Sequence, residues 1–211
     1  PSAAGSPDPV EPLLRAWLAA STNRASFRSD LTQTRHLKTL THPLTSTGRV
    51  WFQAPNQFRW ELGDPPQSIA LRSGDSMMVL SPRLRRAEVY TLGGSASGPA
   101  KDLMGLLDAA FPRSLEELRA QFEVEGVTTN RDRLELILHP RSPMARKLMP
   151  ALTIGLDAAT QELRSTELSM ADGSRLRNEF HGFLTNAPVS AELFRTNLDS
   201  SWTITRNDPR P

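Results

Sequence analysis

Apolar and polar positions alternate along residues 48–82, and this pattern predicts a run of consecutive strands. Phe58, Trp60 and Leu62 are separated by charged residues, which is the period of a strand with one apolar and one hydrated face. Clusters of Pro, Gly, Asn and Asp interrupt the alternation, and such clusters are typical of turns. We therefore expect an antiparallel meander with strands at residues 48–52, 58–62, 69–71 and 77–80.

The strand signal continues on both sides of this meander. A long strand is expected at residues 25–40, and shorter ones at 84–90, 122–127, 133–139, 152–156, 163–170, 175–183 and 194–206, the last with the weakest pattern. The four-residue stretches that begin at Asp157 and Ala171 have the composition of hairpin turns. Residues 93–99 and 142–150 are expected to form loops.

Three segments have helical spacing instead. Residues 11–21 place Leu14, Trp17 and Leu18 on one face of a helix. This apolar stripe fits a helix that caps a sheet as well as a lid over a cavity, and the pattern does not separate the two. Residues 101–111 carry a second stripe, and Ser114 with Glu117 forms a capping box that opens a short third helix.

Together these elements predict a mainly β protein with helices, of the α+β class. We expect a strongly curved antiparallel sheet of about ten or eleven strands, which forms an incomplete β-barrel. About three helices cover this sheet, so that the apolar faces of strands and helices are buried against one another. A chain of 211 residues suits one domain with a sizeable core. We expect a disordered arm at residues 1–9, a single domain at 10–206 and a tail at 207–211.

Composition narrows the range of functions. The formal net charge is +2 and no basic run is interleaved with aromatic residues, so nucleic-acid binding is not expected. The absence of cysteine excludes disulfides, thiolate metal sites, a cysteine nucleophile and a lipid anchor on cysteine. No apolar run approaches the ~20 residues that span a bilayer as a helix.

Candidate catalytic groups do not form a known constellation. Gly74-Asp75-Ser76 is similar to the nucleophile block of GDSL-type esterases, which need an Asp-x-x-His pair late in the chain. Here the late His181 is preceded at that spacing by Asn178. None of the histidines has a second ligand at metal-binding spacing, so we expect no enzyme, no metal and no cofactor. The histidines are His36, His42, His139 and His181.

The meander also carries a specific order of residues. It consists of Gly48, Trp51, Pro55-Asn56-x-Phe58-x-Trp60, Ser68-Ile69-x-Leu71, a glycine turn and an apolar strand that ends in Pro82. This order, with an upstream strand that contains Phe27, Leu31 and Gln33, resembles the LolA family of periplasmic outer-membrane lipoprotein carriers.

The resemblance implies that a curved half-barrel and its helices enclose an apolar cavity that holds acyl chains. On that basis Leu14, Trp17 and Leu18 belong to a lid helix. Without the resemblance, aromatic and methionine side chains on a sheet are more often ordinary core. The candidate lining residues are Phe58, Trp60, Leu62, Ile69, Leu71, Met78, Leu80, Met104, Leu107 and Phe111.

One position departs from the family pattern. The resemblance places an arginine immediately before the Pro-Asn pair, where it ties the sheet to the lid helices, but this chain has Ala54 there. Either another residue holds the lid, with Arg59 and Arg49 as candidates, or the lid closes differently.

The resemblance further implies a non-enzymatic periplasmic carrier that shuttles lipoproteins from the inner to the outer membrane. Its donor would be an inner-membrane ABC-type release complex and its acceptor an outer-membrane lipoprotein receptor. We expect a monomer whose signal peptide has been removed, because the chain begins at Pro1 without methionine. Two alternatives stay open: a carrier of another lipid, glycolipid or pigment, and a periplasmic domain that senses lipids or lipoproteins and regulates signalling.

Overall fold

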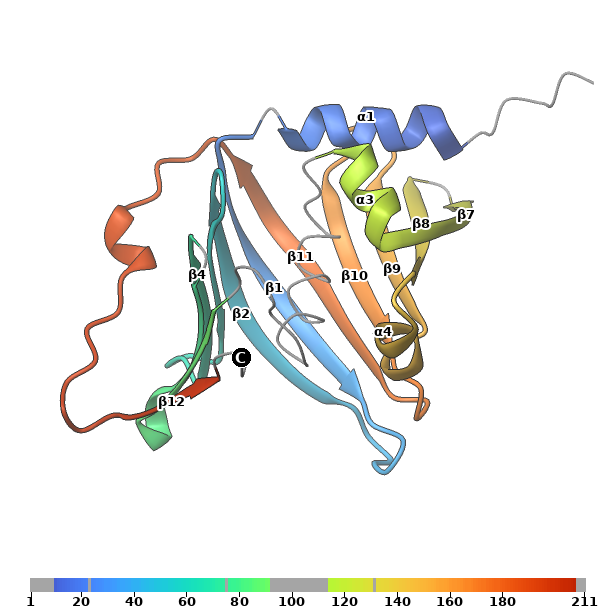
Figure 1. Cartoon of the computed structure of the whole chain (residues 1–211). Coiled ribbons are helices and arrows are strands. Elements are labelled where there is room, and N and C mark those ends of the chain that lie inside the picture. Colours follow the sequence, from blue (N-terminus) through green and yellow to red (C-terminus); the bar gives the residue numbers. More distant parts are fainter. Residues whose placement is uncertain (1–9, 23, 75, 92–113, 131, 208–211) are drawn as a thin grey trace, which may run out of the picture.

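The strands of the molecule belong to one sheet. The computed structural model describes residues 10–22, 24–74, 76–91, 114–130 and 132–207, and these contain twelve strands (Figure 1). The order across the sheet is β12-β6-β5-β4-β3-β2-β1-β11-β10-β9-β8-β7. Their bounds are β1 Ser26–His36, β2 Leu44–Gln53, β3 Gln57–Leu62, β4 Ser68–Ser73, β5 Ser76–Ser81, β6 Arg86–Thr91, β7 Phe122–Asn130, β8 Arg133–Pro140, β9 Ala151–Asp157, β10 Leu163–Ser169, β11 Arg175–Thr185 and β12 Thr203–Asn207.

The sheet is open rather than a nearly closed barrel. All its neighbouring strands are antiparallel except β12 and β6, which are parallel. Figure 1 shows β4 and β12 nearly edge-on while β1, β10 and β11 are seen from their face, so the sheet turns between its two halves. The mainly β class with helices is confirmed, but the sheet has twelve described strands rather than ten or eleven, and it does not curl strongly.

Three α-helices lie in the described part of the chain. They are α1 (Val10–Thr22), α3 (Leu115–Gln121) and α4 (Pro143–Leu148). The Ser114 hydroxyl accepts a hydrogen bond from the Glu117 N–H at 3.0 Å, which confirms the predicted start of α3. The helix expected at residues 101–111 lies outside the described residues. Figure 1 shows α1 lying across one end of the sheet, with α3 beside it.

The helix α4 was missed, because residues 142–150 were expected to form a loop. The Ser142 hydroxyl accepts a hydrogen bond from the Ala145 N–H at 3.3 Å, and Pro143 occupies the first turn. Serine at the N-cap followed by proline is a helix start signal. The signal was therefore present in the sequence, but the six-residue helix is too short to show an apolar period.

One face of the sheet, which we call the inner face, packs against α1 and α3. Strand pairing places Phe27 opposite Phe52, and Leu31 opposite Phe180, on this face. The same apolar cluster contains Leu14 and Trp17 of α1, Leu118 of α3 and the leucines of β8, β9 and β10. Burial of this surface is the main stabilising contribution to the fold.

The opposite, outer face is covered on β4, β5 and β6 by the chain that follows β11. Ile69, Leu80 and Ala87 pack there with Leu198 and Trp202. Figure 1 shows this C-terminal segment, residues 186–202, running outside β4 before the chain enters β12. The strand expected at 194–206 is therefore only β12, because its first residues end a 3₁₀ turn (η2, Ala191–Phe194) and then cover apolar side chains.

Glycine is required at two positions of the sheet, one where two strands approach closely and one at a β-bulge. A Cβ on Gly48 would lie 1.9 Å from the backbone oxygen of Glu61, so only glycine lets β2 and β3 come this close. Gly182 has a φ of +59° at the irregularity between β11 and β1. The extra residue re-aims the strand, so that Phe183 joins the apolar cluster of the inner face.

An ion pair anchors the C-terminal segment. The Arg59 guanidinium donates to Glu61 Oε1 at 2.6 Å and to the Leu193 carbonyl at 3.0 Å, and both charged side chains are mostly buried. We expect Arg59→Ala to lower the free energy of unfolding by about 1.5–3 kcal/mol, because Glu61 loses its charged partner. Limited proteolysis should then cut residues 190–202 sooner.

The matched control for this prediction is Arg49→Ala. Arg49 lies 3.4 Å from Asp30 with both side chains more than half exposed, so its removal should cost less than about 1 kcal/mol. Equal losses in the two variants, or unchanged proteolysis in Arg59→Ala, would show that Arg59 does not hold the segment.

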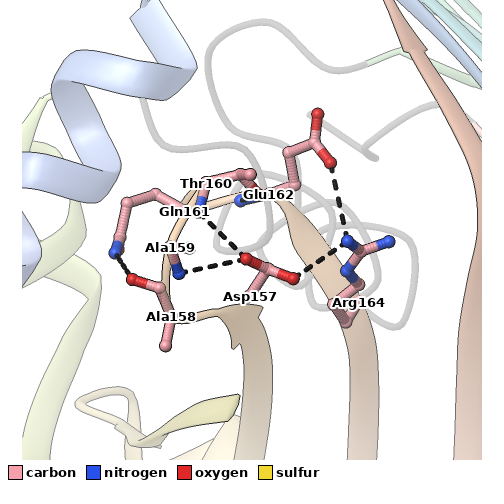
Figure 2. Close-up of polar contacts among 7 residues, drawn as sticks. All are labelled: Asp157, Ala158, Ala159, Thr160, Gln161, Glu162 and Arg164. Carbon is pink, nitrogen blue, oxygen red and sulfur yellow. Dashed lines mark hydrogen bonds and ion pairs between the residues drawn. The ribbon is translucent and has the colours of Figure 1, made fainter. Parts of the chain in front are cut away.

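The turn between β9 and β10 is organised by Asp157 (Figure 2). Its Oδ1 accepts hydrogen bonds from the Ala159 N–H at 3.0 Å and the Thr160 N–H at 2.9 Å, and Arg164 lies 2.9 Å from Oδ2. The Thr160 N–H, followed by the Arg164 guanidinium, lowers the pKa of Asp157 from 3.8 to about 2. The predicted hairpin turn is thus confirmed, with the carboxylate as its centre.

This pKa shift predicts acid sensitivity. A carboxyl group whose pKa is lower in the folded state stabilises the fold above its unfolded pKa and loses that contribution as the pH falls through the folded value. For Asp157 the window runs from 3.8 down to about 2. Asp157→Asn should therefore flatten the dependence of the melting temperature on pH in this window, and a curve parallel to that of the unchanged protein would contradict it.

Candidate functional site

The candidate lining residues are divided between the two faces of the sheet. Pairing places Phe58, Trp60 and Leu62 opposite Phe52, Val50 and Gly48, so these side chains belong to the inner face. The register between β3 and β4 pairs Ile69 with Glu61 and Leu71 with Arg59, which puts the apolar side chains of β4 on the outer face. Met78 and Leu80 pair with them. The set therefore does not line one cavity, because Ile69, Leu71, Met78 and Leu80 lie on the outer face.

The inner face of β3 to β6 carries an apolar surface that is only partly buried. Phe58 and Met77 are its buried members. The Trp60 ring meets the Phe180 ring edge-on, with centroids 5.8 Å apart. A half-covered apolar sheet surface of this kind is unusual in a protein core, where neighbours normally fill the space. Its partly buried members are Phe52, Trp60, Ala70, Val79 and Tyr90.

A column of stacked aromatic rings borders this surface near α1. The Phe27 ring stacks on Phe52 at 5.3 Å and on Phe183 at 4.8 Å. The Arg24 guanidinium lies 5.3 Å from the centroid of Phe183, and burial lowers the pKa of Arg24. The column fixes the position of β1, β2 and β11 relative to the helix end of the inner face.

A row of polar side chains crosses the otherwise apolar inner face. Gln33 Nε2 donates to Asn178 Oδ1 at 2.9 Å, and Asn178 Nδ2 donates to Thr166 Oγ1 at 3.1 Å. The three side chains are each more than nine-tenths buried. Residues 33, 178 and 166 are direct neighbours on β1, β11 and β10. We call them the polar row.

Comparison with known proteins places the chain in a family. The family model described as outer membrane lipoprotein carrier protein LolA matches residues 22–197. The chain belongs to the LolA family. A curated outer-membrane lipoprotein carrier protein from Xanthomonas campestris is 30% identical over 199 residues, which cover 87% of this chain and 90% of that protein. One from Chromohalobacter salexigens is 24% identical and covers 70% of this chain and 64% of its own length.

A solved structure agrees in fold. An uncharacterized conserved protein from Thermus thermophilus superimposes with a TM-score of 0.54 over 94% of this chain and 99% of that chain, at 9% sequence identity. At this identity the likeness concerns the fold alone. The sequence-based assignment to the LolA family is thus confirmed by the family model and by the curated relatives.

The helix α1 holds its three predicted residues against the inner face. Leu14 and Trp17 are 0% and 1% exposed and belong to the main apolar cluster, and Leu18 is also buried. Three of the predicted lining residues, Met104, Leu107 and Phe111, lie outside the described part of the chain. Within the described residues, α1 therefore supplies most of the helical cover of the inner face.

The two candidate latch arginines do not reach α1. Arg59 and Arg49 both project from the outer face, where they meet Glu61 and Asp30. The helix contact that is present instead joins α1 to α3, because Glu11 pairs with Arg119. Among the described residues, Glu11 therefore joins α1 to α3 through Arg119, and neither candidate latch arginine takes part in this contact.

The hydrolase alternative has no geometric support. Ser76 lies on β5 and His181 on β11, and the sheet order places β4, β3, β2 and β1 between them. Five strand spacings correspond to about 24 Å, too far for a nucleophile and its base. Instead His181 lies 3.4 Å from the Thr32 hydroxyl on the outer face, beside a groove of about 400 Å³ lined mainly by polar residues.

Two further titratable groups, His139 and Tyr90, have pKa values raised by nearby carboxylates. His139 lies 2.6 Å from Glu125 and 2.8 Å from the Pro150 carbonyl, and these contacts, that to Glu125 first, raise the pKa of His139. A hydrogen bond to Glu88 raises the pKa of Tyr90 to about 12. Among the residues that the structure describes, no three His, Asp or Glu side chains come together as a metal site, and no helix there is long and apolar enough to span a membrane.

Proposed function

We propose that this protein is a periplasmic carrier that binds acyl chains on the inner face of its sheet and shuttles lipoproteins from the inner to the outer membrane. The observation that carries the proposal is the partly buried apolar surface around Trp60 and Phe180, in a chain that belongs to the LolA family. Carriers of that family are not enzymes.

Hydrophobic transfer explains why an acyl chain would occupy this surface. Each buried methylene group contributes roughly 0.8 kcal/mol, so a 16-carbon chain loses on the order of 10 kcal/mol when it leaves a membrane for water. Aromatic and aliphatic side chains of the inner face offset this cost without a specific fit, since dispersion and hydrophobic contacts are not directional. A carrier of this kind therefore accepts chains of different proteins.

The lining that we propose is the inner-face subset of the predicted residues. Phe58, Trp60 and Leu62 supply it from β3, and Phe180 supplies it from β11. Met104, Leu107 and Phe111 remain proposed members from outside the described residues. On cargo binding the two halves of the sheet would wrap the chains as an incomplete barrel, with α1 as the lid.

The lid must open to release cargo, and its polar contacts are suited to this. The pair between Glu11 and Arg119 has side chains that are 28% and 47% exposed, so its contribution is roughly 0–1 kcal/mol. The stronger contact is the burial of Leu14 and Trp17. A partner that offers an alternative apolar surface to the inner face would therefore displace the lid without breaking a strong ion pair.

Transport of lipoproteins from the inner to the outer membrane requires a donor and an acceptor. We propose an inner-membrane ABC-type complex as the donor and an outer-membrane receptor as the acceptor, with this protein acting as a monomer between them. The test is reconstitution of the donor complex with a lipoprotein in proteoliposomes, to which the purified protein and ATP are added. We expect the lipoprotein to appear in the soluble fraction in a one-to-one complex, and only with ATP.

Two results would contradict the proposal. If the lipoprotein stays in the membrane although the added protein is folded, the protein does not accept lipoproteins. If a lipid or glycolipid from the liposome leaves with the protein instead, the inner face binds acyl chains but the cargo is not a lipoprotein.

A further inference from the structure

The polar row is a buried hydrogen-bonded polar feature of the inner face. Gln33, Asn178 and Thr166 are 7%, 6% and 7% exposed. Apolar residues lie beside it on the same face: Leu31 precedes Gln33 by two residues, and Ile154 pairs directly with Thr166. Buried polar groups that only stabilise a sheet can be replaced by apolar ones of the same shape at little cost. A different role is therefore worth testing.

The row has a direction, which the arginine at its start imposes. Arg35 Nε lies 3.2 Å from Gln33 Oε1. Arginine can only donate, so the accepting atom of Gln33 is its oxygen and its nitrogen faces Asn178. The same reasoning orients Asn178, whose nitrogen faces the Thr166 hydroxyl. Every hydrogen bond in the row thus points away from the guanidinium.

The row ends in a donor that has no acceptor. Thr166 Oγ1 accepts from Asn178, and its own hydrogen has no acceptor among the residues that the structure describes. Hydrogen bonds in a chain polarise one another, so a row that begins at a cation strengthens the last O–H as a donor. An unsatisfied donor beside Ile154 and Leu168 is costly unless another group accepts from it.

We infer that the Thr166 hydroxyl, oriented by Arg35, Gln33 and Asn178, binds the ester or amide carbonyl oxygen of an acyl group on the inner face. A carbonyl is the group that fits, because an acyl chain is apolar apart from this acceptor and the Thr166 hydroxyl still has a hydrogen to donate. The inference rests on the proposed function, and adds to it a polar subsite that fixes how deeply the chain enters.

The inference predicts a preference between two lipids that differ only at the carbonyl. Dipalmitoyl phosphatidylglycerol has ester carbonyls, and its dihexadecyl ether analogue has none. We expect the unchanged protein to bind the ester lipid roughly tenfold more tightly than the ether, as one hydrogen bond in an apolar site would give. The affinities are measured by displacement of a fluorescent fatty acid from the protein.

Three variants assign the preference to the row. Thr166→Val removes the hydroxyl with little change of shape and should bind both lipids equally, at the affinity of the ether. Thr166→Ser keeps a hydroxyl and should keep the preference. Thr153→Val is the matched control, because Thr153 pairs with Glu167 on the outer face of the neighbouring strand. It should behave like the unchanged protein.

The outcomes separate this inference from the proposed function. If the unchanged protein binds both lipids equally, or if Thr166→Val keeps the preference, the subsite is overturned while acyl binding stands. If neither lipid binds, the proposed function fails, and the subsite with it. Should Thr166→Val not fold, the infrared stretch of a carbon-13-labelled ester carbonyl in the unchanged complex decides. A shift to lower frequency than in an apolar solvent supports the subsite, and an unshifted band overturns it.

Discussion

Trp60→Glu should abolish lipid uptake while the protein stays folded. The indole lies on the inner face of β3, meets Phe180 edge-on and is only partly buried, so water can reach a carboxylate there in the empty protein. Once acyl chains cover that position, the carboxylate loses its hydration without gaining a partner, which costs several kcal/mol. Since 1.4 kcal/mol is tenfold in affinity, binding of a fluorescent fatty acid should fall by at least about a hundredfold.

The matched control puts the same charge on the other face of the sheet. Thr47 is exposed on β2 and neighbours Gly48, whose position belongs to the inner face. Thr47→Glu should bind the fatty acid as the unchanged protein does. Unchanged binding in a folded Trp60→Glu variant, or equal losses in both, would place the acyl site elsewhere.

Trp17→Ala should cause the largest loss of stability. Trp17 is 1% exposed in the cluster that joins α1 to the inner face, and truncation of a buried aromatic side chain costs about 3–5 kcal/mol. The free energy of unfolding of a domain is about 5–15 kcal/mol, so this substitution removes a large part of it. Urea unfolding followed by circular dichroism measures the change.

The control for Trp17→Ala is Arg15→Ala on the exposed side of the same helix. Within the described residues, Arg15 pairs with Glu11, four residues earlier, at 2.8 Å, so its loss should cost about 0.3–0.5 kcal/mol. If Trp17→Ala is also destabilised by less than about 1 kcal/mol, the range of an exposed ion pair, α1 contributes little to the fold and opens more easily than we propose.

The meander was predictable because its signals are local. The alternation around Phe58 and Trp60 and the turns after Gln53 and Leu62 depend on neighbouring residues alone, and β2 to β5 lie where they were expected. The face of each strand was not predictable in the same way. A shift of one residue in the β3–β4 register exchanges the faces of β4, and only the pairing of Ile69 with Glu61 shows that its apolar side chains point outward.

The C-terminal segment explains why the outer faces of β4 and β5 are apolar. Leu198 and Trp202 lie in a stretch that forms neither helix nor strand, and their partners Ile69 and Leu80 lie more than a hundred residues earlier. The sequence therefore showed more apolar side chains than one face needs, and the LolA resemblance led us to assign all of them to one cavity. The additional apolar side chains, on the outer face of β4 and β5, form the contact between this segment and the sheet.

The polar row depends on pairings between distant strands, which no local pattern shows. Gln33 was noted only as part of the strand that resembles the LolA family, and Asn178 only as a residue that breaks an esterase pattern. Thr166 gave no signal at all. Their contact across β1, β11 and β10 follows from pairings between residues up to 145 positions apart.

Native mass spectrometry of the protein purified from its own periplasm, followed by organic extraction of what it holds, shows whether the protein carries lipoproteins. We predict a one-to-one complex with an acylated lipoprotein, and loss of that complex in Trp60→Glu. A protein that is folded but empty, and that takes up no added acyl lipid, would contradict it and leave the inner face of the sheet as ordinary core.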